Sequence, residues 1–245
     1  MIWACAQRWK GVQSLSEWVS RVATDLPTTM FVLLQLAEKV EKLHASGLCH
    51  RDLKPSNVLW RPTANAWTLM DFGCAAHFGA RRSVMRSRSH AHMLHTRGAI
   101  DAGTRAGERA RLAYSIHYAA PEVILASEAG ERDMVVTGAL DMWALGIISV
   151  ELLTGRRVFA PPMTEAMARD QLAGRTPLPW EDPALRGAVH GKLKLLRRSV
   201  LKCLERDPTQ RPTSRELLGL WNGLFESATG ATTADYVMPE RRVVL

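Results

Sequence analysis

The clearest hydrophobic pattern in the chain has a helical period. Apolar residues recur every three or four positions from Thr29, charged residues lie mostly on the other side, and Gly47 is a natural stop for this helix. Residues 137–154 are apolar almost all round, which predicts a helix that is buried on every side. Residues 164–173 and the basic stretch 193–204 are predicted as two further helices.

Two segments have the spacing of a capping box, in which a hydroxyl residue is followed by Glu three positions later. Ser14 and Glu17 open a short helix, and Thr213 and Glu216 open the last helix of the chain. The proline-containing residues 26–28 are expected to break the first of these helices.

Strand signals are short and local. Residues 58–60 and 67–70 are β-prone, and Pro62 and Asn65 between them indicate a hairpin with a longer turn. Residues 1–9 are compatible with one more short strand. The pattern therefore predicts a mainly α protein with a small β-hairpin.

Composition narrows the class of protein. The 245 residues, 47% hydrophobic and 23% charged, are typical of one soluble globular domain, and no run of about 18 apolar residues predicts a membrane span. The beginning of the chain is too short and too soon charged to be a signal peptide. Four scattered cysteines without Cys-x-x-Cys spacing indicate free thiols in a reducing compartment, so we expect an intracellular, cytoplasmic protein.

The net charge of +8 is local. Residues 74–119 hold eight arginines and two acidic residues, a net of +6, whereas the rest of the chain carries +2. This segment has weak periodicity and several glycines, which predicts a mobile loop. A nucleic-acid-binding face is therefore disfavoured. A metal site at His90, His92 and His95 is disfavoured too, because no structured partner is evident.

The residues with the most chemistry lie between His50 and Asn57, which read His-Arg-Asp-Leu-Lys-Pro-Ser-Asn. The proline makes this stretch a loop, which can direct the side chains of Asp52, Lys54 and Asn57 into one small volume. Asp71 supplies a second carboxylate from the far arm of the hairpin. A carboxylate to take a proton, a cation, and an Asn with an Asp to hold a divalent metal are the parts that phosphoryl transfer requires.

These motifs resemble the large C-terminal lobe of a eukaryotic-type protein kinase. The stretch His50-Arg51-Asp52-Leu53-Lys54-Pro55-Ser56-Asn57 matches the catalytic loop residue for residue, Asp71-Phe72-Gly73 matches the metal-binding triplet, and Ala120-Pro121-Glu122 matches the triplet that closes the activation segment. Lys54 two residues after Asp52 is the serine/threonine-kinase pattern.

The resemblance implies phosphorylation of serine or threonine hydroxyls of a protein substrate with ATP and Mg²⁺. Asp52 would orient the hydroxyl and accept its proton, and Lys54 would lie by the γ-phosphate. Asn57 and Asp71 would hold Mg²⁺. Leu59 would lie under the adenine ring, a role that is compatible with a core position.

The resemblance also implies residues that support the site. Ser115 corresponds to a family Thr that bonds the catalytic Asp and Lys, although Tyr114 stands where the family has Gly. Asp141 would accept hydrogen bonds from catalytic-loop N–H groups, since a lone buried carboxylate is costly; the alternative is an exposed Asp favoured by the helix dipole. Arg211 would form a buried ion pair with Glu122; the alternative is a surface Arg.

Residues 74–119 correspond to the kinase activation segment and are unusually long. A phosphate on this segment would pair with Arg51 and order the loop. The alternative is an insert without a regulatory site. The candidate phosphate acceptors are Ser83, Ser87, Ser89, Thr96 and Thr104.

The small lobe of a kinase supplies a glycine-rich loop, a strand Lys and a helix Glu, and the sequence contains none of these motifs. Residues 1–13 resemble the last small-lobe strand and the hinge, residues 14–226 the large lobe, and residues 227–245 a poorly ordered tail. We therefore expect an essentially absent N-lobe and a fragment or short product that is weakly active alone. The alternatives are an inactive kinase-fold scaffold and, less favoured, a nucleic-acid binder.

Overall fold

The computed structural model describes residues 14–19, 25–84, 111–112, 115–130, 134–159, 162–181 and 194–238. The predictions for residues 1–13, for the three clustered histidines and for most of the candidate phosphate acceptors lie outside the described residues.

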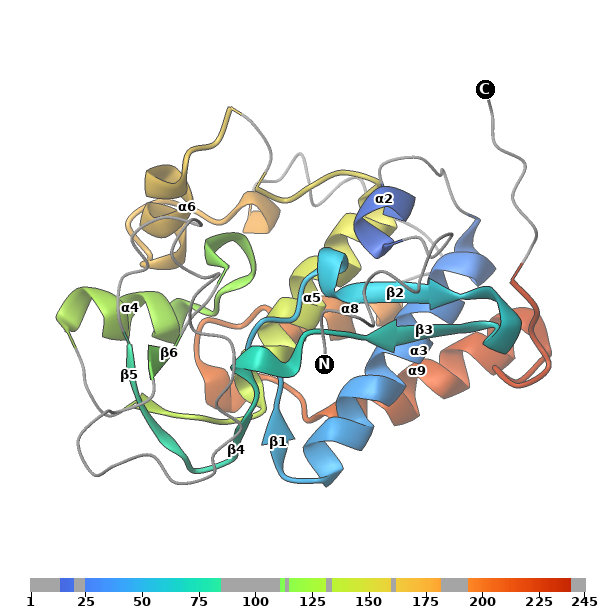
Figure 1. Cartoon of the computed structure of the whole chain (residues 1–245). Helices are drawn as coiled ribbons and strands as arrows, with labels where there is room; N and C mark the ends of the chain where they lie inside the picture. The colour runs from blue at the N-terminus through green and yellow to red at the C-terminus, as the bar shows by residue number, and fades with distance from the viewer. Residues whose placement is uncertain are drawn as a thin grey trace.

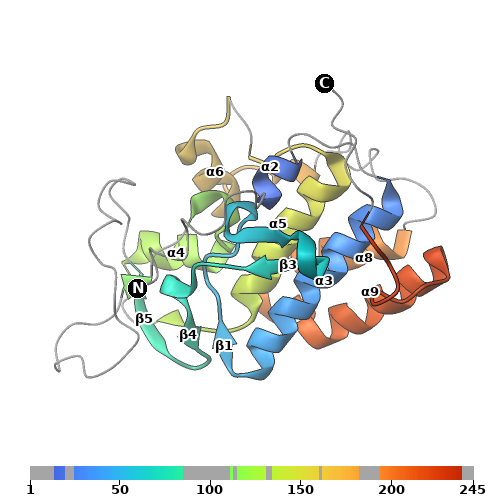
Figure 2. The same ribbon diagram turned by 45° about the vertical axis from the view of Figure 1, so that its right-hand side comes forward.

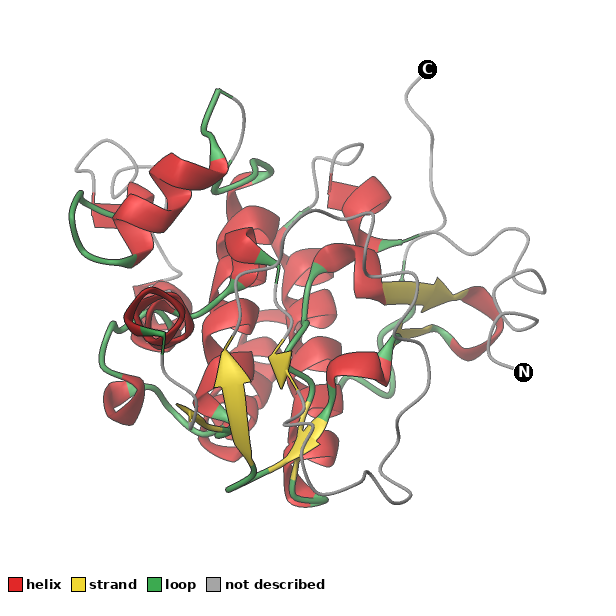
Figure 3. Cartoon of the chain, turned by 60° about the vertical axis from the view of Figure 1, so that its left-hand side comes forward, coloured by secondary structure: helices red, strands yellow, loops and turns green. Residues whose placement is uncertain are grey.

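Helices are the main secondary structure of the described chain, and the strands are short pieces beside them (Figure 3). The helices, with the labels of Figure 1, are α2 (Leu15–Val19), α3 (Leu26–Ala45), α4 (Pro121–Ala129), α5 (Ala139–Thr154), α6 (Glu165–Leu172), α8 (Lys194–Cys203) and α9 (Ser214–Thr229). Single 3₁₀ turns are η1 (Pro55–Asn57), η2 (Pro62–Ala64), η3 (Phe72–Cys74), η5 (Ile116–Tyr118), η6 (Pro179–Glu181) and η7 (Pro208–Gln210). The predominantly helical architecture is confirmed.

Helix α5 is the centre of the molecule, as its apolar sequence predicts. It is buried along most of its length and packs against α3 and α8. Figures 1 and 2 show α3 and α9 running side by side on one side of α5, with α4 and α6 on the other. Gly155, with φ +65°, ends α5, as expected of a glycine that can adopt the left-handed conformation.

Helix α3 begins earlier than the sequence pattern predicts. The proline-containing residues 26–28 form its first turn instead of a break, because the Asp25 carboxylate accepts a hydrogen bond from Thr28 N (2.8 Å) and caps the helix. Proline is tolerated there, since N–H groups of the first turn have no intrahelical acceptor. The helix ends at Ala45, and Gly47 follows with φ +75°.

Both predicted capping boxes are present. Ser14 N donates to Glu17 Oε2 (3.4 Å) and Glu17 N to Ser14 Oγ (3.3 Å) at the start of α2. The same reciprocal pair, between Thr213 and Glu216, opens α9. These local signals specify where two helices start, independently of the packing around them.

The predicted hairpin is formed by β2 (Val58–Arg61) and β3 (Ala66–Leu69), which pair antiparallel with Val58 opposite Leu69. Asn65 takes the left-handed conformation (φ +45°) in the turn. A β-bridge joins Ser14 to Leu59, so that the start of α2 lies beside the hairpin.

More short strands exist than the sequence pattern predicts. β1 (Leu48–Cys49) pairs antiparallel with β4 (Ala76–His77), and β5 (Arg81–Val84) lies between β7 (Met134–Val135), antiparallel, and β6 (Arg111–Leu112), parallel. Strands of two residues have no alternation to detect, because tertiary proximity rather than periodicity creates them. The described parts of segment 74–119 are therefore not without secondary structure.

The chain beyond α9 is packed as far as the structure describes it, in contrast to the poorly ordered tail expected there. The Tyr236 ring lies 4.9 Å from the ring of Phe31 and 5.5 Å from that of Phe225, and its hydroxyl lies 3.0 Å from Thr28 Oγ1. Asn65 Nδ2 also donates to the Tyr236 carbonyl (2.9 Å). Burial of one aromatic ring thus holds the segment onto α3 and α9. Residues 239–245 lie outside the described residues.

The helices in the described ranges include none with the length and apolar character needed to cross a membrane.

Gly146 tests the packing of α5 on α8. A Cβ at this position would lie 2.7 Å from Leu204 Cδ2 and 3.0 Å from Cys203 Cβ. We expect Gly146→Ala to lower the free energy of unfolding by about 1–2 kcal/mol, because overpacking outweighs the gain in helix propensity. Urea denaturation followed by circular dichroism measures the change.

The matched controls are Gly219→Ala and Gly223→Ala in α9, where a Cβ would meet nothing within 4 Å. These substitutions are expected to raise the free energy of unfolding by up to about 1 kcal/mol. A stabilised Gly146→Ala variant would contradict the close approach of α5 and α8.

Candidate active site

The candidate site is built where the loop after β1 passes under the N-terminal turn of α5. Asp141, in that turn, is fully buried. Its Oδ2 accepts hydrogen bonds from His50 N (2.7 Å), and its Oδ1 from Arg51 N (2.8 Å). The loop backbone is therefore fixed to the central helix by one carboxylate. The alternative of an exposed Asp141 is excluded.

Hydrogen bonds keep Asp141 ionised despite its burial. Burial by itself would raise the pKa of this carboxyl group. The hydrogen bond from His44 and the two backbone N–H donors outweigh burial, and the pKa is lowered from its ordinary value. The folded protein can thus bury this carboxylate because hydrogen-bond donors surround it.

Arg51 shows why the loop needs this support. Its backbone has φ +67°, a left-handed conformation that is unfavourable for a residue with a side chain. Its side chain donates from Nε to the carbonyl oxygen of Cys74, just after the Asp-Phe-Gly triplet. Arg51 therefore links the catalytic loop to the start of segment 74–119.

His50 faces the hairpin side of the site. Its Nε2 lies 3.1 Å from the Met70 carbonyl oxygen, and its ring lies 5.0 Å from the ring of Phe72. The Phe72 side chain is nevertheless 48% exposed. His50 thus positions the residues on either side of Asp71.

The functional groups meet around Asp52, which is only 7% exposed. Lys54 Nζ donates to Asp52 Oδ2 (2.7 Å) and to Ser115 Oγ (2.9 Å), and Ser115 Oγ donates to Asp52 Oδ1 (2.8 Å). Asn57 Nδ2 donates to the Asp52 carbonyl (2.8 Å) and to Oδ2 (3.2 Å). Ser115 fills the place predicted for it, even though Tyr114 precedes it.

Asp71 lies beside this cluster because the hairpin returns the chain to it. Met70 N donates to the Asn57 carbonyl (2.8 Å), so Asp71 is one residue beyond a direct backbone link to Asn57. Asp71 has φ +61°, and its Oδ1 accepts from Gly73 N (3.4 Å). Its side chain is exposed at the surface of the site.

The donor set suits a divalent metal ion that is shared with a ligand. No group of three or more His, Cys, Asp or Glu side chains that could hold a metal by itself occurs within the described ranges. The Asn57 side chain uses its nitrogen toward Asp52, which leaves its amide oxygen, and Asp71 adds an exposed carboxylate. Mg²⁺ in proteins commonly takes one or two such oxygens together with substrate phosphates.

Glu122 and Arg211 form the predicted pair. Arg211 Nη1 and Nη2 each lie 2.7 Å from one Glu122 carboxylate oxygen, and the Arg211 side chain is fully buried. Arg211 also donates to the carbonyl oxygens of Glu205 (2.8 Å) and Ala139 (2.9 Å). The pair ties the start of α4 to the start of α5, below the site.

Leu59 lies on β2 and is half-buried. Its strand is bridged to Ser14, and α2 follows directly. It is thus neither a fully buried core residue nor a surface one, and the position remains compatible with both predicted roles.

Sequence reasoning missed His44. Its Nε2 lies 2.9 Å from Asp141 Oδ2 and its Nδ1 lies 3.1 Å from Ser214 Oγ, so it connects α3, α5 and α9. Only its position at the end of a helix, six residues before His50, could have indicated this role. It also missed Glu151, Tyr118 and Arg157, which form a hydrogen-bonded chain at the edge of the site.

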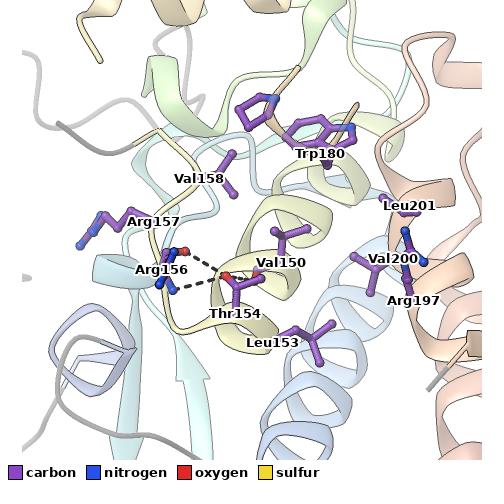
Figure 4. A pocket seen from close by; sticks show the side chains of 11 residues that line it. Val150, Leu153, Thr154, Arg156, Arg157, Val158, Trp180, Arg197, Val200 and Leu201 are labelled. Atoms are coloured by element: carbon purple, nitrogen blue, oxygen red, sulfur yellow. Dashed lines mark hydrogen bonds between the residues drawn. The ribbon is translucent and has the colours of Figure 1, made fainter. Parts of the chain in front are cut away.

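A cavity of about 110 Å³ lies between α5 and α8 (Figure 4). Its walls are mostly apolar, with Val150, Leu153, Val200 and Leu201 facing one another. Arg157, at the edge of the site, is one of its lining residues, but Asp52, Lys54 and Ser115 are not, so we assign the cavity no part in the chemistry.

The family assignment rests on this arrangement together with the sequence. Residues 8–220 match the family described as "Protein kinase domain". The chain belongs to the protein kinase family. The predicted resemblance is thereby confirmed at the level of the family, whose members use ATP and a divalent metal ion to phosphorylate proteins.

Several curated kinases are similar to this chain. Serine/threonine-protein kinase SSK22 of Saccharomyces cerevisiae is 31% identical over 203 residues, which are 81% of this chain and 13% of that protein. Calcium/calmodulin-dependent protein kinase cmkA of Emericella nidulans is 30% identical over 189 residues, 75% of this chain and 36% of that protein. Serine/threonine-protein kinase Pkn1 of Myxococcus xanthus is 30% identical over 203 residues, 82% and 24% respectively. The chain thus spans between 13% and 36% of the length of these relatives.

Asp141 generates a prediction about stability and pH. The Asp141→Asn side chain has one oxygen to accept the hydrogen bonds of three donors, which are His44 and the N–H groups of His50 and Arg51. We expect the free energy of unfolding at pH 7 to fall by about 3 kcal/mol, because buried N–H groups lose an ionised acceptor. Urea denaturation at a series of pH values measures this.

The pH dependence follows from the lowered pKa. A carboxylate whose folded pKa lies below its unfolded value, ordinarily 3.8, adds stability above that value and loses it as the pH falls through the folded pKa. The gap between wild type and Asp141→Asn should therefore shrink below about pH 4, whereas the exposed control Asp235→Asn should follow wild type throughout. A gap of equal size at pH 7 and pH 3 is incompatible with an ionised Asp141.

Proposed function

We propose that this chain transfers the γ-phosphate of ATP to serine or threonine hydroxyls of protein substrates, with Mg²⁺. The observation that supports the proposal best is the cluster of Lys54, Ser115 and Asn57 around the Asp52 carboxylate, with Asp71 beside it. A buried, fully oriented carboxylate next to an exposed one is the arrangement that proton acceptance and metal binding require.

Asp52 is proposed to orient the substrate hydroxyl and accept its proton. Its two oxygens have about four acceptor positions, and three are occupied by Lys54, Ser115 and Asn57. About one position thus remains for an incoming hydroxyl. Because the other three bonds fix the carboxylate, that hydroxyl would meet an acceptor that needs no reorganisation.

Lys54 is proposed to balance negative charge on the transferred phosphoryl group. Its ammonium group lies 2.7 Å from Asp52 Oδ2 and retains partial exposure. It can therefore approach a phosphate while it holds the base in place. Ser115 donates to Asp52 and accepts from Lys54, so it joins the loop before α4 to the catalytic loop.

Asn57 and Asp71 are proposed to hold Mg²⁺, which when bound neutralises charge on the phosphates. The part of Asp71 depends on the hairpin, because the register of β2 and β3 sets its distance from Asn57. Arg51 is proposed to receive a regulatory phosphate, since it already contacts segment 74–119 at Cys74.

We also propose that residues 14–226 form the large lobe and residues 1–13 the last strand and hinge of the small lobe. The bridge between Ser14 and Leu59 supports this division, since it brings the beginning of α2 to the strand that would face adenine. The sequence contains no glycine-rich loop and no matching strand Lys, so we propose that these 245 residues alone bind ATP and transfer phosphate weakly.

Asp52→Asn tests the reaction. We expect the rate of radiolabelled phosphate transfer from ATP to a serine-containing protein substrate to fall by about 10²- to 10⁴-fold, the usual contribution of a general base. Asp235→Asn, an exposed carboxylate far along the chain, is the matched control and should retain wild-type transfer. Ser115→Thr should preserve transfer and Ser115→Ala should lower it, because only the former keeps the hydroxyl.

Equal rates of phosphate transfer by wild type and Asp52→Asn would contradict the assignment of Asp52 as the proton acceptor. If wild type binds the protein substrate but transfers no phosphate to it, a kinase-fold scaffold is favoured instead.

The affinity for ATP tests the contribution of the missing motifs. Isothermal titration calorimetry of the 245-residue chain with ATP and Mg²⁺ should give a Kd well above the low micromolar range. In kinases the glycine-rich loop and the strand Lys contact the phosphates, and the loss of each such contact lowers phosphate binding by a large factor. Asp71→Asn should weaken binding with Mg²⁺ present and change it little without Mg²⁺. A low-micromolar Kd for wild type would refute the proposed weak binding.

A further inference from the structure

Arg157 joins three elements at the edge of the candidate site. It lies two residues after Gly155, in the loop that follows α5. Its Nη1 donates to Tyr118 Oη (3.3 Å) and its Nη2 donates to Ser16 Oγ (2.6 Å). It is one of the residues that line the cavity between α5 and α8, and Figure 4 shows its side chain extending outward from the rim, on the opposite side from Arg197. The guanidinium group therefore spans the gap between η5 and α2.

The position of Tyr118 relates Arg157 to the reaction centre. Tyr118 follows Ser115 by three residues in one continuous turn, η5, and Ser115 Oγ is 2.8 Å from Asp52 Oδ1. Three residues span at most about 10 Å. Arg157 is thus within reach of the side chains that neighbour a substrate hydroxyl bound at Asp52.

Arg157 presents a positive charge here, because the carboxylate of Glu151, at the other end of the hydrogen-bonded chain, is covered. Glu151 is 3% exposed, and both of its oxygens are occupied, Oε2 by Tyr118 Oη (3.0 Å) and Oε1 by Val158 N (3.1 Å). Arg157 is exposed, and the two groups to which its side chain donates, Tyr118 Oη and Ser16 Oγ, are neutral hydroxyls. Within the described ranges no carboxylate forms an ion pair with it. The outer end of the chain Glu151–Tyr118–Arg157 is therefore a cation.

We infer that Arg157 is a specificity-determining residue that binds the carboxylate of an aspartate or glutamate side chain near the phosphorylated residue of a protein substrate. The inference rests on the proposed function and names the class of its substrate. Arginine has a planar fork of donors that matches a carboxylate, and two hydroxyl partners hold it in place without neutralising it. An acidic side chain would replace water on the exposed edge of this fork.

The charge preference is confined to one position. His117, the neighbour of Tyr118, is influenced by the negative charge of Glu165 at the start of α6, on the other side of η5. Burial lowers the pKa of His117, which keeps this ring mainly neutral near pH 7. A general preference for acidic peptides is therefore not expected; only the residue that passes between η5 and α2 meets Arg157.

The test uses fluorescein-labelled serine peptides on the 245-residue chain at low salt. Glutamate or lysine is placed in turn at each of the three positions on either side of the serine, and Kd is measured by fluorescence anisotropy. At one position the glutamate peptide should bind about fivefold or more tighter than the lysine peptide, the size expected of a partly exposed ion pair. Arg157→Met should remove this difference, and Arg157→Glu should reverse it.

Arg156→Glu is the matched control, since Arg156 is an exposed neighbour without a contact to Tyr118 or Ser16. It should leave the difference within about twofold. Circular dichroism of each variant checks folding, and Arg157→Met tests the same contact without a new charge. Equal binding of glutamate and lysine peptides at every position, including binding of neither, overturns the inference, as does an equal response to Arg156→Glu.

Phosphate transfer to the same peptides separates this inference from the proposed function. A charge-dependent Kd without transfer above the level of Asp52→Asn contradicts the proposed function and supports the binding subsite. Transfer that depends on Asp52 but is indifferent to the charge of the peptide contradicts the subsite alone.

Discussion

The rest of the site depends on one interaction: the buried Asp141 carboxylate accepts hydrogen bonds from two backbone N–H groups of the catalytic loop. It fixes the loop that carries Asp52 to the most buried helix of the protein. It also holds Arg51 in a left-handed conformation that such a residue would not adopt alone. The ring of His44 contributes a third donor and ties the same carboxylate to α3. A buried charge in the first turn of an apolar helix thus anchors the catalytic loop, and donors from that loop and from His44 stabilise the charge in turn.

Helix α5 serves the site at both of its ends. Its first turn supplies Asp141 and, through the Ala139 carbonyl, an acceptor for Arg211. Its last turns supply Glu151, whose pKa is raised by burial and which anchors the loop around Tyr118. Between these ends Gly146 allows Leu204 to pack against the helix axis. The reaction centre and the edge where a substrate would lie are therefore held by one rigid body, which limits their relative motion.

Features that arise from short, continuous stretches of sequence could be predicted, whereas features that depend on distant contacts could not. The catalytic loop, the apolar helix over residues 139–154 and the capping box at Thr213 are local patterns, each contained in fewer than about twenty residues. His44 and Arg157 lack such a pattern, because their partners lie 97 and 141 residues away in the chain. The additional strand pairs and the packing of Tyr236 were missed for the same reason. Local chemistry can be recognised from sequence, whereas contacts of high sequence separation require the fold.

The pairing of α3 with α9 has a consequence for synthesis on the ribosome. Thr28 on α3 meets Tyr236, which lies 208 residues later, and His44 meets Ser214, which lies 170 residues later. Because translation proceeds at about 5–20 residues per second, the C-terminal partner is synthesised roughly 10–40 s after the N-terminal one. During that interval the part of the apolar surface of α3 that α9 covers is exposed. Because α9 is synthesised after the elements it packs against, this apolar surface is most exposed to aggregation before that helix is complete.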